Sequence, residues 1–396
     1  MFECVNPQEN VCFGCRACEN VCPISAIMMQ QDDIGFLYPH VDQQKCVRCG
    51  LCAKTCPMLN SQKYDTETQE IYAVAIKDKE LLSKSTSGGA FSLFANDVIA
   101  QGGVVFGVTL DENMFVKHIG VETQEDLAVL RGSKYVQSDT GDVYTQILYH
   151  LQSGRKVLFS GMPCQVDGLN RFLDAKKQSA EILLTIDILC HGVPSPKIWK
   201  DYVSCIEEVY HGKLKSFKFR SKMAGWENSI EYAEFENGKK VYNTHAIRTY
   251  LTMFHKNLSL RPSCYACDYH TYQRCSDITI GDFWGIDKSM PEINDNKGLS
   301  LMIVNTKKGK EAFDRVSSGA VVHSSNAKNC EQRALICNAK TKGDVDAFRK
   351  DYAEHGYAYI AQKYATRSNG SLMKIKMITV LYKLKLLPTF KKILGK

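Results

Sequence analysis

One cysteine spacing occurs twice near the start of the chain, and it restricts the fold more than any other feature. Each copy reads C-x2-C-x2-C-x3-C-P, and the second begins at Cys46 where the first begins at Cys12. In this spacing, typical of paired 4Fe-4S clusters, three thiolates of one run share a cluster with the fourth thiolate of the other. We therefore expect one cluster on Cys12, Cys15, Cys18 and Cys56, and a second on Cys46, Cys49, Cys52 and Cys22.

Two other interpretations of these cysteines are a zinc site and a disulfide framework. Zinc usually takes two cysteine pairs with a longer gap between them, and disulfides need an oxidising compartment. The doubled spacing instead resembles that of a bacterial two-cluster ferredoxin, over residues 1–60. We expect an α+β ferredoxin-like module in which residues 26–39 form a hairpin that turns at residues 33–35.

The composition limits the compartment and the partners. The chain has 396 residues, which indicates two or three domains, and 17 cysteines. Residues 1–11 lack a basic and apolar leader, so we expect a cytoplasmic protein whose cysteines bind metal or stay reduced. Much of the net charge of +7 lies in residues 371–396, which favours a basic tail over a nucleic-acid groove. No uninterrupted apolar run of membrane-spanning length occurs.

Beyond residue 60 the pattern changes. Residues 61–70 are polar and lack periodicity, so we interpret them as a linker. After them, short apolar runs alternate with segments of helical periodicity, which indicates an α/β domain with some parallel strands. The expected strands are residues 71–76, 104–110, 157–160, 182–189, 277–280 and 300–305, and the expected helices are residues 90–100, 140–151 and 165–173.

A β-rich insertion interrupts this alternation. Its expected strands are residues 214–220, 230–235 and 239–242, the last two joined by a Glu-Asn-Gly hairpin turn. A helix over residues 347–361 closes the domain. The predicted organisation is a ferredoxin-like domain, the linker, an α/β domain and a C-terminal helix with a basic tail, over residues 1–60, 61–70, 71–345 and 346–396.

Several loops in the α/β domain carry side chains suited to a cofactor. Residues 86–90 read Thr-Ser-Gly-Gly-Ala and lead into an expected helix, whose N-terminus can bind phosphate or can be an ordinary helix start. Residues 131–138 add two cations, a glycine and a tyrosine, and they also suit an ordinary turn. Cys164 and Cys190 each follow an expected strand, where a cysteine can be a ligand or a buried apolar side chain.

Six short motifs in order resemble the beta subunit of the coenzyme F420 hydrogenase/dehydrogenase family. They are Ser87-Gly88-Gly89, Gly132-Ser133-Lys134-Tyr135-Val136-Gln137-Ser138, Gly161-Met162-Pro163-Cys164-Gln165, Cys190-His191-Gly192, Cys264-Tyr265-Ala266-Cys267 and the Ser-Asp-Ile-Thr-Ile-Gly-Asp-Phe-Trp-Gly run at residues 276–285. The resemblance implies an FAD-containing iron-sulfur oxidoreductase with an α/β flavin-binding domain.

The resemblance also assigns roles to two of these motifs. It implies that Ser87, Gly88 and Gly89 lie against the FAD pyrophosphate, and that the segment Gly132, Ser133, Lys134 and Tyr135 binds the cofactor on its flavin side. Lys134 would then favour the reduced, anionic flavin by its charge. The alternative for Lys134 is a lysine that faces solvent.

A third 4Fe-4S cluster is expected from the remaining paired cysteines. Cys164 and Cys190 follow neighbouring strands, and the C-x-x-C pair Cys264 and Cys267 needs two more thiolates, so together they supply four ligands. Cys275 is the alternative to either strand-end cysteine, which would then remain as a reactive thiol. Apart from that alternative, five cysteines have no ligand spacing and are expected to be structural or free thiols: Cys4, Cys205, Cys275, Cys330 and Cys337.

Three functions follow from these features. The leading one is an oxidoreductase that moves electrons between 4Fe-4S clusters and FAD, to or from a deazaflavin (coenzyme F420) or another organic substrate. The second is an electron-transfer subunit that serves a separate catalytic protein, and the third is an iron-sulfur assembly or sensing protein without flavin. The expected partner is a ferredoxin or an oxidoreductase subunit.

The sequence identifies no catalytic residue. His191 and His270 adjoin expected ligands and suit either proton relay or a structural role. No G-x-G-x-x-G turn follows a strand, so a separate NAD site is not expected.

The tail at residues 371–396 interleaves apolar side chains with lysines. Such a segment can lie in the headgroup region of an anionic membrane, which would place the protein at the inner face of that membrane. It can also dock as a terminal helix on the protein's own surface. Pro388 would break either helix near its end.

Overall fold

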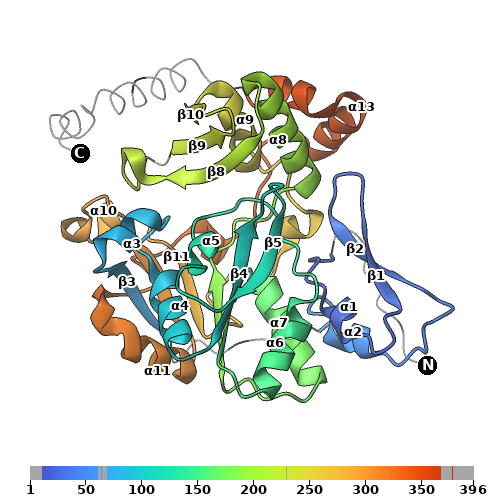
Figure 1. Cartoon of the computed structure of the whole chain (residues 1–396), viewed down its shortest axis with the longest axis vertical. Coiled ribbons are helices and arrows are strands. Elements are labelled where there is room, and N and C mark those ends of the chain that lie inside the picture. Colours follow the sequence, from blue (N-terminus) through green and yellow to red (C-terminus); the bar gives the residue numbers. More distant parts are fainter. Residues whose placement is uncertain (1–10, 61–63, 65–68, 229, 367–376, 378–396) are drawn as a thin grey trace.

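The computed structural model describes residues 11–60, 64, 69–228, 230–366 and 377. Figure 1 shows a small N-terminal module beside a large sheet, with a further group of helices and short strands above that sheet. The expectations for Cys4, and for the tail apart from Met377, concern residues outside this description. None of the described helices has the length and apolar character needed to span a membrane.

The N-terminal module is a hairpin between two short helices. Its elements are α1 (Ala17–Val21), β1 (Ile27–Gln31), β2 (Leu37–Val41) and α2 (Leu51–Thr55). The two strands are antiparallel, with Ile27 opposite Val41, so the expected hairpin is confirmed. Each helix is followed by the fourth cysteine of its run and then by proline, which lacks the amide hydrogen that a further helical turn would need.

The large sheet has eight strands of mixed direction. In spatial order they are β13 (Ala320–Ser325), β3 (Glu70–Ile76), β12 (Ser300–Val304), β11 (Ile278–Asp282), β7 (Leu183–Ile188), β6 (Val157–Gly161), β4 (Val104–Leu110) and β5 (Val116–Val121). The central strands β11, β7, β6 and β4 are parallel, and their neighbours on either side are antiparallel. The expected mixed α/β domain is therefore confirmed. The carboxyl ends of the four parallel strands meet at one edge of the sheet.

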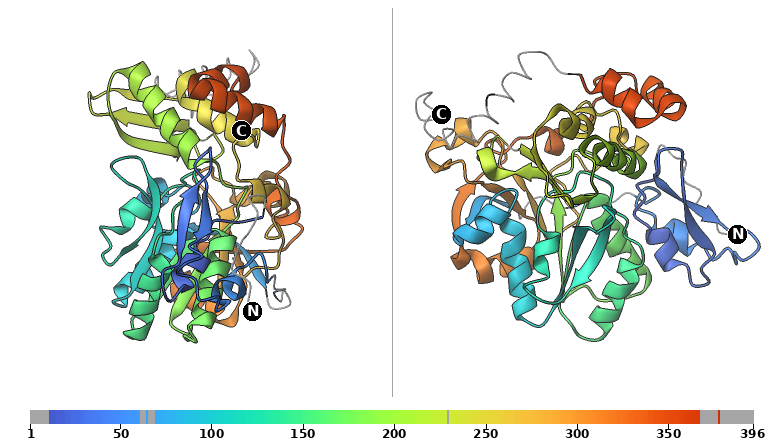
Figure 2. Two further views of the ribbon diagram at one scale, coloured as in Figure 1. Left: turned by 90° about the vertical axis from the view of Figure 1, so that its right-hand side faces the viewer. Right: turned by 45° about the horizontal axis from the view of Figure 1, so that its top comes forward.

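Helices cover both faces of this sheet (Figures 1 and 2). One face packs against α4 (Ala90–Ala100), α5 (Leu127–Leu130) and α11 (Lys307–Val316). The other packs against α6 (Val143–Gln152) and α7 (Pro163–Ala175). Alternate residues of β6 divide between the two cores, Leu158 on one side and Phe159 on the other, as the pleat of a doubly covered strand requires.

The β-rich insertion is a separate sheet that carries its own helices. Strands β8 (Leu214–Ser221), β9 (Ile230–Phe235) and β10 (Lys240–Tyr242) form an antiparallel sheet. Helices α8 (Pro196–Tyr210), α9 (His245–His255) and α13 (Val345–Tyr364) pack with it around a buried aromatic core that includes Trp199, Tyr202 and Tyr250. We call this layer the cap, because it lies beyond the carboxyl-end edge of the large sheet (Figure 1).

Several elements were absent from the sequence-based expectations. Among them are β5, β13, α8 and α11. Strand β13 ends in His323, Ser324 and Ser325, and α11 begins with two lysines, so neither has the apolar run that marks a buried element. The expected helix at residues 347–361 is confirmed, but Gly356 interrupts it with φ of 74°.

The N-terminal module packs against the α/β domain. Val21 and Ile27 of the module share one apolar core with Ile147 of α6 and Phe172 of α7. Arg16 donates from Nη2 to Oδ2 of Asp139 at 2.9 Å, and further contacts reach the cap, where Lys197 donates to the carbonyl of Asp33 at 2.9 Å. The module is therefore held by apolar packing and by polar contacts at both ends.

A buried ion pair ties the loop after the C-x-x-C pair to the sheet. Arg274 and Asp187 are both buried, with Nη2 of Arg274 3.0 Å from Oδ2 of Asp187 at the end of β7. The same guanidinium donates to the carbonyls of Tyr269, Thr271 and Ile188. Burial raises the pKa of Asp187, and the adjacent Arg274 opposes that rise.

Replacing Arg274 with Met should lower the free energy of unfolding by about 3–5 kcal/mol, because Asp187 would stay buried without its cation. Urea unfolding followed by fluorescence measures this change. The control Arg155→Met removes a surface pair with Glu122 and should cost less than about 1 kcal/mol. Equal losses in the two variants would contradict the role of the buried pair.

Candidate functional site

Two cavities in the module are each lined by four cysteines. One is lined by Cys12, Cys15, Cys18 and Cys56, and the other by Cys46, Cys49, Cys52 and Cys22. This is the interleaved division that the spacing predicts. We call them the inner and the outer cysteine group, because the inner group adjoins the α/β domain. Side chains of the hairpin help to line both cavities, Met29 and Pro39 in the inner one and Ile27 and Val41 in the outer one.

The cysteines of the inner group are mostly buried and close to one another. Burial raises the pKa of the Cys15 thiol, and the nearby Cys56 and Cys12 raise it further. Cys18 is affected in the same way. Within the described residues, no group of three or more His, Cys, Asp or Glu side chains is arranged to hold a single metal ion. As ligands these groups would be thiolates that repel one another, and the positive charge of bound iron would offset that repulsion.

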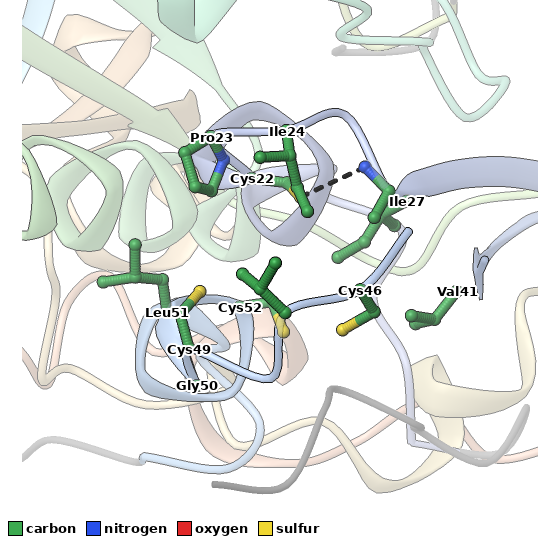
Figure 3. A pocket seen from close by; sticks show the side chains of 12 residues that line it. Cys22, Pro23, Ile24, Ile27, Val41, Cys46, Cys49, Gly50, Leu51 and Cys52 are labelled. Atoms are coloured by element: carbon green, nitrogen blue, oxygen red, sulfur yellow. Dashed lines mark hydrogen bonds between the residues drawn. The ribbon is translucent and has the colours of Figure 1, made fainter. Parts of the chain in front are cut away.

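The outer group has the same local backbone geometry as the inner group. In Figure 3 the sulfurs of Cys22, Cys46, Cys49 and Cys52 face a common space. The amide of Arg48 lies 3.4 Å from Sγ of Cys46, as the amide of Gly14 lies 3.4 Å from Sγ of Cys12 in the inner group. Both amide-bearing residues have positive φ, 54° and 69°. The repeat therefore preserves the loop that surrounds the sulfurs.

One arginine fastens the inner group to the rest of the protein. Arg261 is only 1% exposed and donates from Nε to the carbonyl of Cys12 at 2.6 Å. It also donates to Oε1 of Gln137 at 3.0 Å and to the carbonyl of Leu37 at 2.9 Å. Its guanidinium lies 4.3 Å from the ring centre of Tyr38. Arg261 thus contacts the cysteine run, the hairpin and the segment of residues 132–138 at once.

A glycine of α7 lets the inner group approach the α/β domain closely. A Cβ on Gly168 would lie 3.0 Å from Sγ of Cys15 and 3.1 Å from the hydroxyl of Tyr144. Cys164 lies four residues earlier on the same helix, and residues so spaced share one helical face. In keeping with this geometry, Cys15 is one of the groups that raise the pKa of the Cys164 thiol. The same face of α7 therefore contacts the inner group and carries Cys164, the first member of the next set of cysteines.

That next set consists of Cys164, Cys190, Cys264 and Cys267, which we call the sheet-edge cysteines. Burial raises the pKa of Cys164, and the nearby thiolates of Cys267, Cys190 and Cys264 raise it further. The backbone arrangement explains this proximity. Residue 194 bridges residue 260, and the amide of Val193 lies 3.5 Å from Sγ of Cys264. The four sequence-predicted thiols are therefore brought together at the ends of β6 and β7.

Cys275 has a different environment. Its thiol donates to the carbonyl of Pro163 at 3.3 Å, and its own carbonyl accepts from Asn170. The charges that act on it come from Asp187, Asp167 and Arg274 rather than from the sheet-edge cysteines. This placement favours the set with Cys164 and Cys190 over the alternative with Cys275. His270 donates from Nε2 to the carbonyl of Cys190 at 3.0 Å and so supports the backbone beside these thiols.

The two segments expected to bind FAD lie side by side. The amide of Ser133 donates to Oγ1 of Thr86 at 3.0 Å, and Nε of Arg131 donates to Oγ of Ser92 at 3.2 Å. Gly89 precedes α4 with φ of 85°, and no side chain caps the amides of that helix. In this structure Ser87 and Gly88 bond to the start of β12, through the carbonyl of Leu299 and the hydroxyl of Ser300.

Lys134 is neither exposed nor free. Its ammonium donates to the carbonyls of Val129, Leu130 and Arg131 at 2.9 to 3.0 Å and so caps the end of α5. Burial lowers its pKa to about 7, while the three carbonyls favour the charged form.

Tyr135 packs edge-on to Phe219 at 5.8 Å between ring centres and thereby joins this loop to the cap.

The cap contributes further cations that the sequence did not single out. Nζ of Lys222 donates to the carbonyl of Leu82 at 2.8 Å and also to that of Ser87, just before α4. Arg220 pairs with Asp282 and lies 5.2 Å from the ring centre of Trp284. Trp284 in turn stacks on Trp226, with ring centres 4.9 Å apart. The only sequence signal for these cations was their position at the end of an expected strand.

Cysteines and candidate flavin loops share one edge of the large sheet. Ser300 begins β12 opposite Asp282, the last residue of β11, while Cys190 and Cys164 follow β7 and β6. The strands run in the order β12, β11, β7, β6. The start of α4, which bonds to the start of β12, therefore lies two strands from Cys190 and three strands from Cys164. It lies at the edge where open α/β sheets usually bind ligands.

Two family models match the chain. Residues 11–59 match the 4Fe-4S dicluster domain, and residues 154–329 match the C terminus of the coenzyme F420 hydrogenase/dehydrogenase beta subunit. The first range contains the inner and outer groups. The second contains the sheet-edge cysteines and most of the cap.

Individual relatives are distant but cover most of the chain. The subunit designated F in F(420)H(2) dehydrogenase of Methanosarcina mazei is 21% identical, over 88% of this chain and 95% of that protein. Coenzyme F420-dependent sulfite reductase of Methanocaldococcus jannaschii is 24% identical over 78% of this chain, which spans 46% of that protein. A chain of the F420-reducing NiFe hydrogenase complex from Methanosarcina barkeri has 20% identity and a TM-score of 0.45, over 76% of this chain and 91% of that one.

Replacing Arg261 with Met should loosen the module without unfolding the large sheet. The variant loses three charge-assisted contacts, and we expect amide hydrogen exchange in residues 11–60 to accelerate by about tenfold to a hundredfold, equivalent to about 1.5–3 kcal/mol. Mass spectrometry of the anaerobic protein measures this exchange. The control Arg315→Met, which removes a pair with Asp97 away from the module, should leave it unchanged. Unchanged exchange in both variants would contradict the role of Arg261.

Proposed function

This chain belongs to the family of coenzyme F420 hydrogenase/dehydrogenase beta subunits and carries a two-cluster ferredoxin-like domain, and on that premise we propose that it is an iron-sulfur flavoprotein oxidoreductase. The proposed cofactors are three 4Fe-4S clusters and one FAD. The inner group, the outer group and the sheet-edge cysteines would each supply four thiolates to one cluster. A flavin exchanges electron pairs with organic molecules and a cluster carries single electrons, so the set would convert between the two.

The observation that carries this proposal is the arrangement of cysteines along α7. Cys15 of the inner group contacts the helix at Gly168, and Cys164 lies one turn earlier on the same face. The three cysteine groups are therefore arranged in order, from outer to inner to sheet edge. Arg261 supports this order because it bonds to the carbonyl of Cys12 and lies three residues before Cys264. Such a series of thiolates suits transfer between the module and the sheet edge.

We propose that FAD lies between the start of α4, residues 131–135 and the cap. The amides at the start of α4 would donate hydrogen bonds to the pyrophosphate, and Lys222, Arg131 and Arg220 would supply positive charge around it. Because Ser87 and Gly88 already bond to β12, their part would be to hold the start of α4 in place. Lys134 would hold residues 131–135 in position for the flavin, because its ammonium fastens this loop to the end of α5.

The proposed substrate is a deazaflavin of the F420 type or another organic compound that exchanges electron pairs. The names of both curated relatives refer to F420, which supports the first choice. An alternative is an electron-transfer subunit that has no substrate of its own, and the M. mazei relative is named as a subunit. Turnover of reduced F420 by the isolated chain, with a one-electron dye as acceptor, would support an oxidoreductase with its own substrate. No turnover by protein that contains all its iron and FAD would support the electron-transfer subunit.

The anaerobic protein should contain about twelve irons per chain, four for each cysteine group. In a Cys264→Ser variant the content should fall to about eight, while the clusters of the module stay reducible. Iron analysis and electron paramagnetic resonance measure the two effects. The control Cys205→Ser changes a half-buried cysteine of α8 and should keep all the irons.

Two results would contradict the third cluster. One is a content of about eight irons in the unmutated protein, and the other is an unchanged content in Cys264→Ser. Either result would mean that the sheet-edge cysteines are not ligands.

A Lys222→Met variant should bind FAD about tenfold more weakly, equivalent to about 1.4 kcal/mol, because a buried cation beside the start of α4 would be lost. Titration of flavin-free protein, followed by flavin fluorescence, measures the affinity. The control Lys218→Met lies on β8 with its ammonium over Tyr232, and it should bind FAD normally. Equal affinities for the two variants and the unmutated protein would place the flavin elsewhere.

A further inference from the structure

The inner and outer cysteine groups differ in what surrounds them. In the inner group Cys12, Cys15 and Cys18 are buried and Cys56 is half-buried, next to α7 and Arg261. In the outer group Cys52 is buried, Cys22 and Cys46 are half-buried and Cys49 is exposed. Both groups share one local backbone geometry, so the difference arises from packing against the α/β domain. The outer group therefore lies at the surface of the molecule, at the far end of the series of cysteine groups from the sheet edge.

Apolar side chains surround the exposed side of the outer group. Ile24 is 41% exposed and Val47 is 65% exposed, and both line the same cavity as Cys49. Figure 3 shows Ile24 and Cys49 at this cavity. Leu51 and Pro23 complete this rim. An exposed apolar patch at an opening onto bound metal is typical of a surface that is covered intermittently by another molecule.

Charge is distributed unevenly over the module. Residues 43–60 contain Lys45, Arg48 and Lys54 and no Asp or Glu. The acidic Asp33 belongs to the hairpin turn, where its carbonyl accepts from Lys197 of the cap. Glu19 pairs with Arg16, next to the α/β domain. The run that carries the outer group is therefore basic, although Asp42 lies 3.5 Å from Lys45.

We propose that this outer face, defined by Ile24, Lys45, Val47, Arg48 and Lys54 around the outer group, docks a small acidic protein that carries one electron at a time. The inference rests on the proposed function, and it adds which cluster meets the partner and which charge the partner bears. A basic rim attracts an acidic partner and accelerates its association, while the apolar centre excludes water at the contact. One electron passes at each encounter, and no bond is made or broken.

Other occupants fit this face less well. A second copy of the chain in a symmetric pair would bring two basic faces together, and like charges repel. A small organic molecule that exchanges electron pairs does not match a cluster that carries one electron. A one-electron protein carrier with acidic residues around its own redox centre matches both the charge and the electron count.

The test measures binding rather than turnover. An acidic two-cluster ferredoxin serves as the probe, and calorimetry under anaerobic conditions gives its dissociation constant for the full iron-loaded chain. In a Lys45→Glu variant we expect the dissociation constant to rise about tenfold at low salt and to differ less than about threefold at about 0.5 M salt, because screening weakens charge attraction. The matched control Lys215→Glu changes a lysine of the cap with equal exposure, 64% against 66%, and should bind as the unmutated chain does.

A second pair of variants tests the apolar centre. Val47→Asn should weaken binding several-fold at both salt concentrations, since apolar burial is not screened. Val209→Asn, at a valine of α8 that is 51% exposed, is the control and should have no effect.

Three results would overturn the docking proposal. They are no measurable binding to the unmutated chain at low salt, equal effects of Lys45→Glu and Lys215→Glu, and binding of anionic lipid vesicles that depends on Lys45 in place of ferredoxin binding. Iron and flavin contents measured on the same samples separate these failures from a failure of the proposed function. Loss of the third cluster or of FAD leaves the module and its outer face in place.

Discussion

The close approach of Cys15 to α7 at Gly168 is the contact on which the arrangement of the protein depends. A Cβ at this position would press on both the sulfur of Cys15 and the hydroxyl of Tyr144, and these neighbours would have to shift by a few tenths of an ångström. Because Cys164 lies one turn away on that helix, the same contact sets the separation between the module and the sheet-edge cysteines.

Buried cations complete this arrangement. Arg261 and Arg274 lie beside the two cysteine groups at the interface, and each is satisfied by carbonyl groups or by a carboxylate. A buried guanidinium is costly without such partners, so each one holds its loop in a defined position. Both charges also oppose the negative charge of clustered thiolates. At the other end of the sheet edge, Lys222 of the cap donates to backbone carbonyls before α4 and so fixes the start of that helix.

Sequence patterns predicted the parts of the fold that depend on local order. The central strands, the hairpin and the β-rich insertion followed from short apolar runs and turn residues, which act over a few positions. Strand β13 was missed because its second half is polar, and pairing with β3 makes it regular. Helix α8 was missed although its buried residues recur at helical spacing after a Ser-Pro start. Arg261 and Lys222 were missed because neither belongs to a recurring spacing and both act through distant carbonyls.

The amino-acid sequence by itself determined the division of eight cysteines into two groups, because that division follows from the spacing within two short loops. It also indicated that Cys164 and Cys190 would lie close together, because parallel strands bring their carboxyl ends to one edge. The tertiary structure placed Cys264 and Cys267 near them and Cys275 in a different environment. Only the tertiary structure decided which of the two equivalent loops is buried and which faces solvent. That difference depends on the packing of α1 and α2 against α6 and α7, and such packing joins residues more than a hundred positions apart.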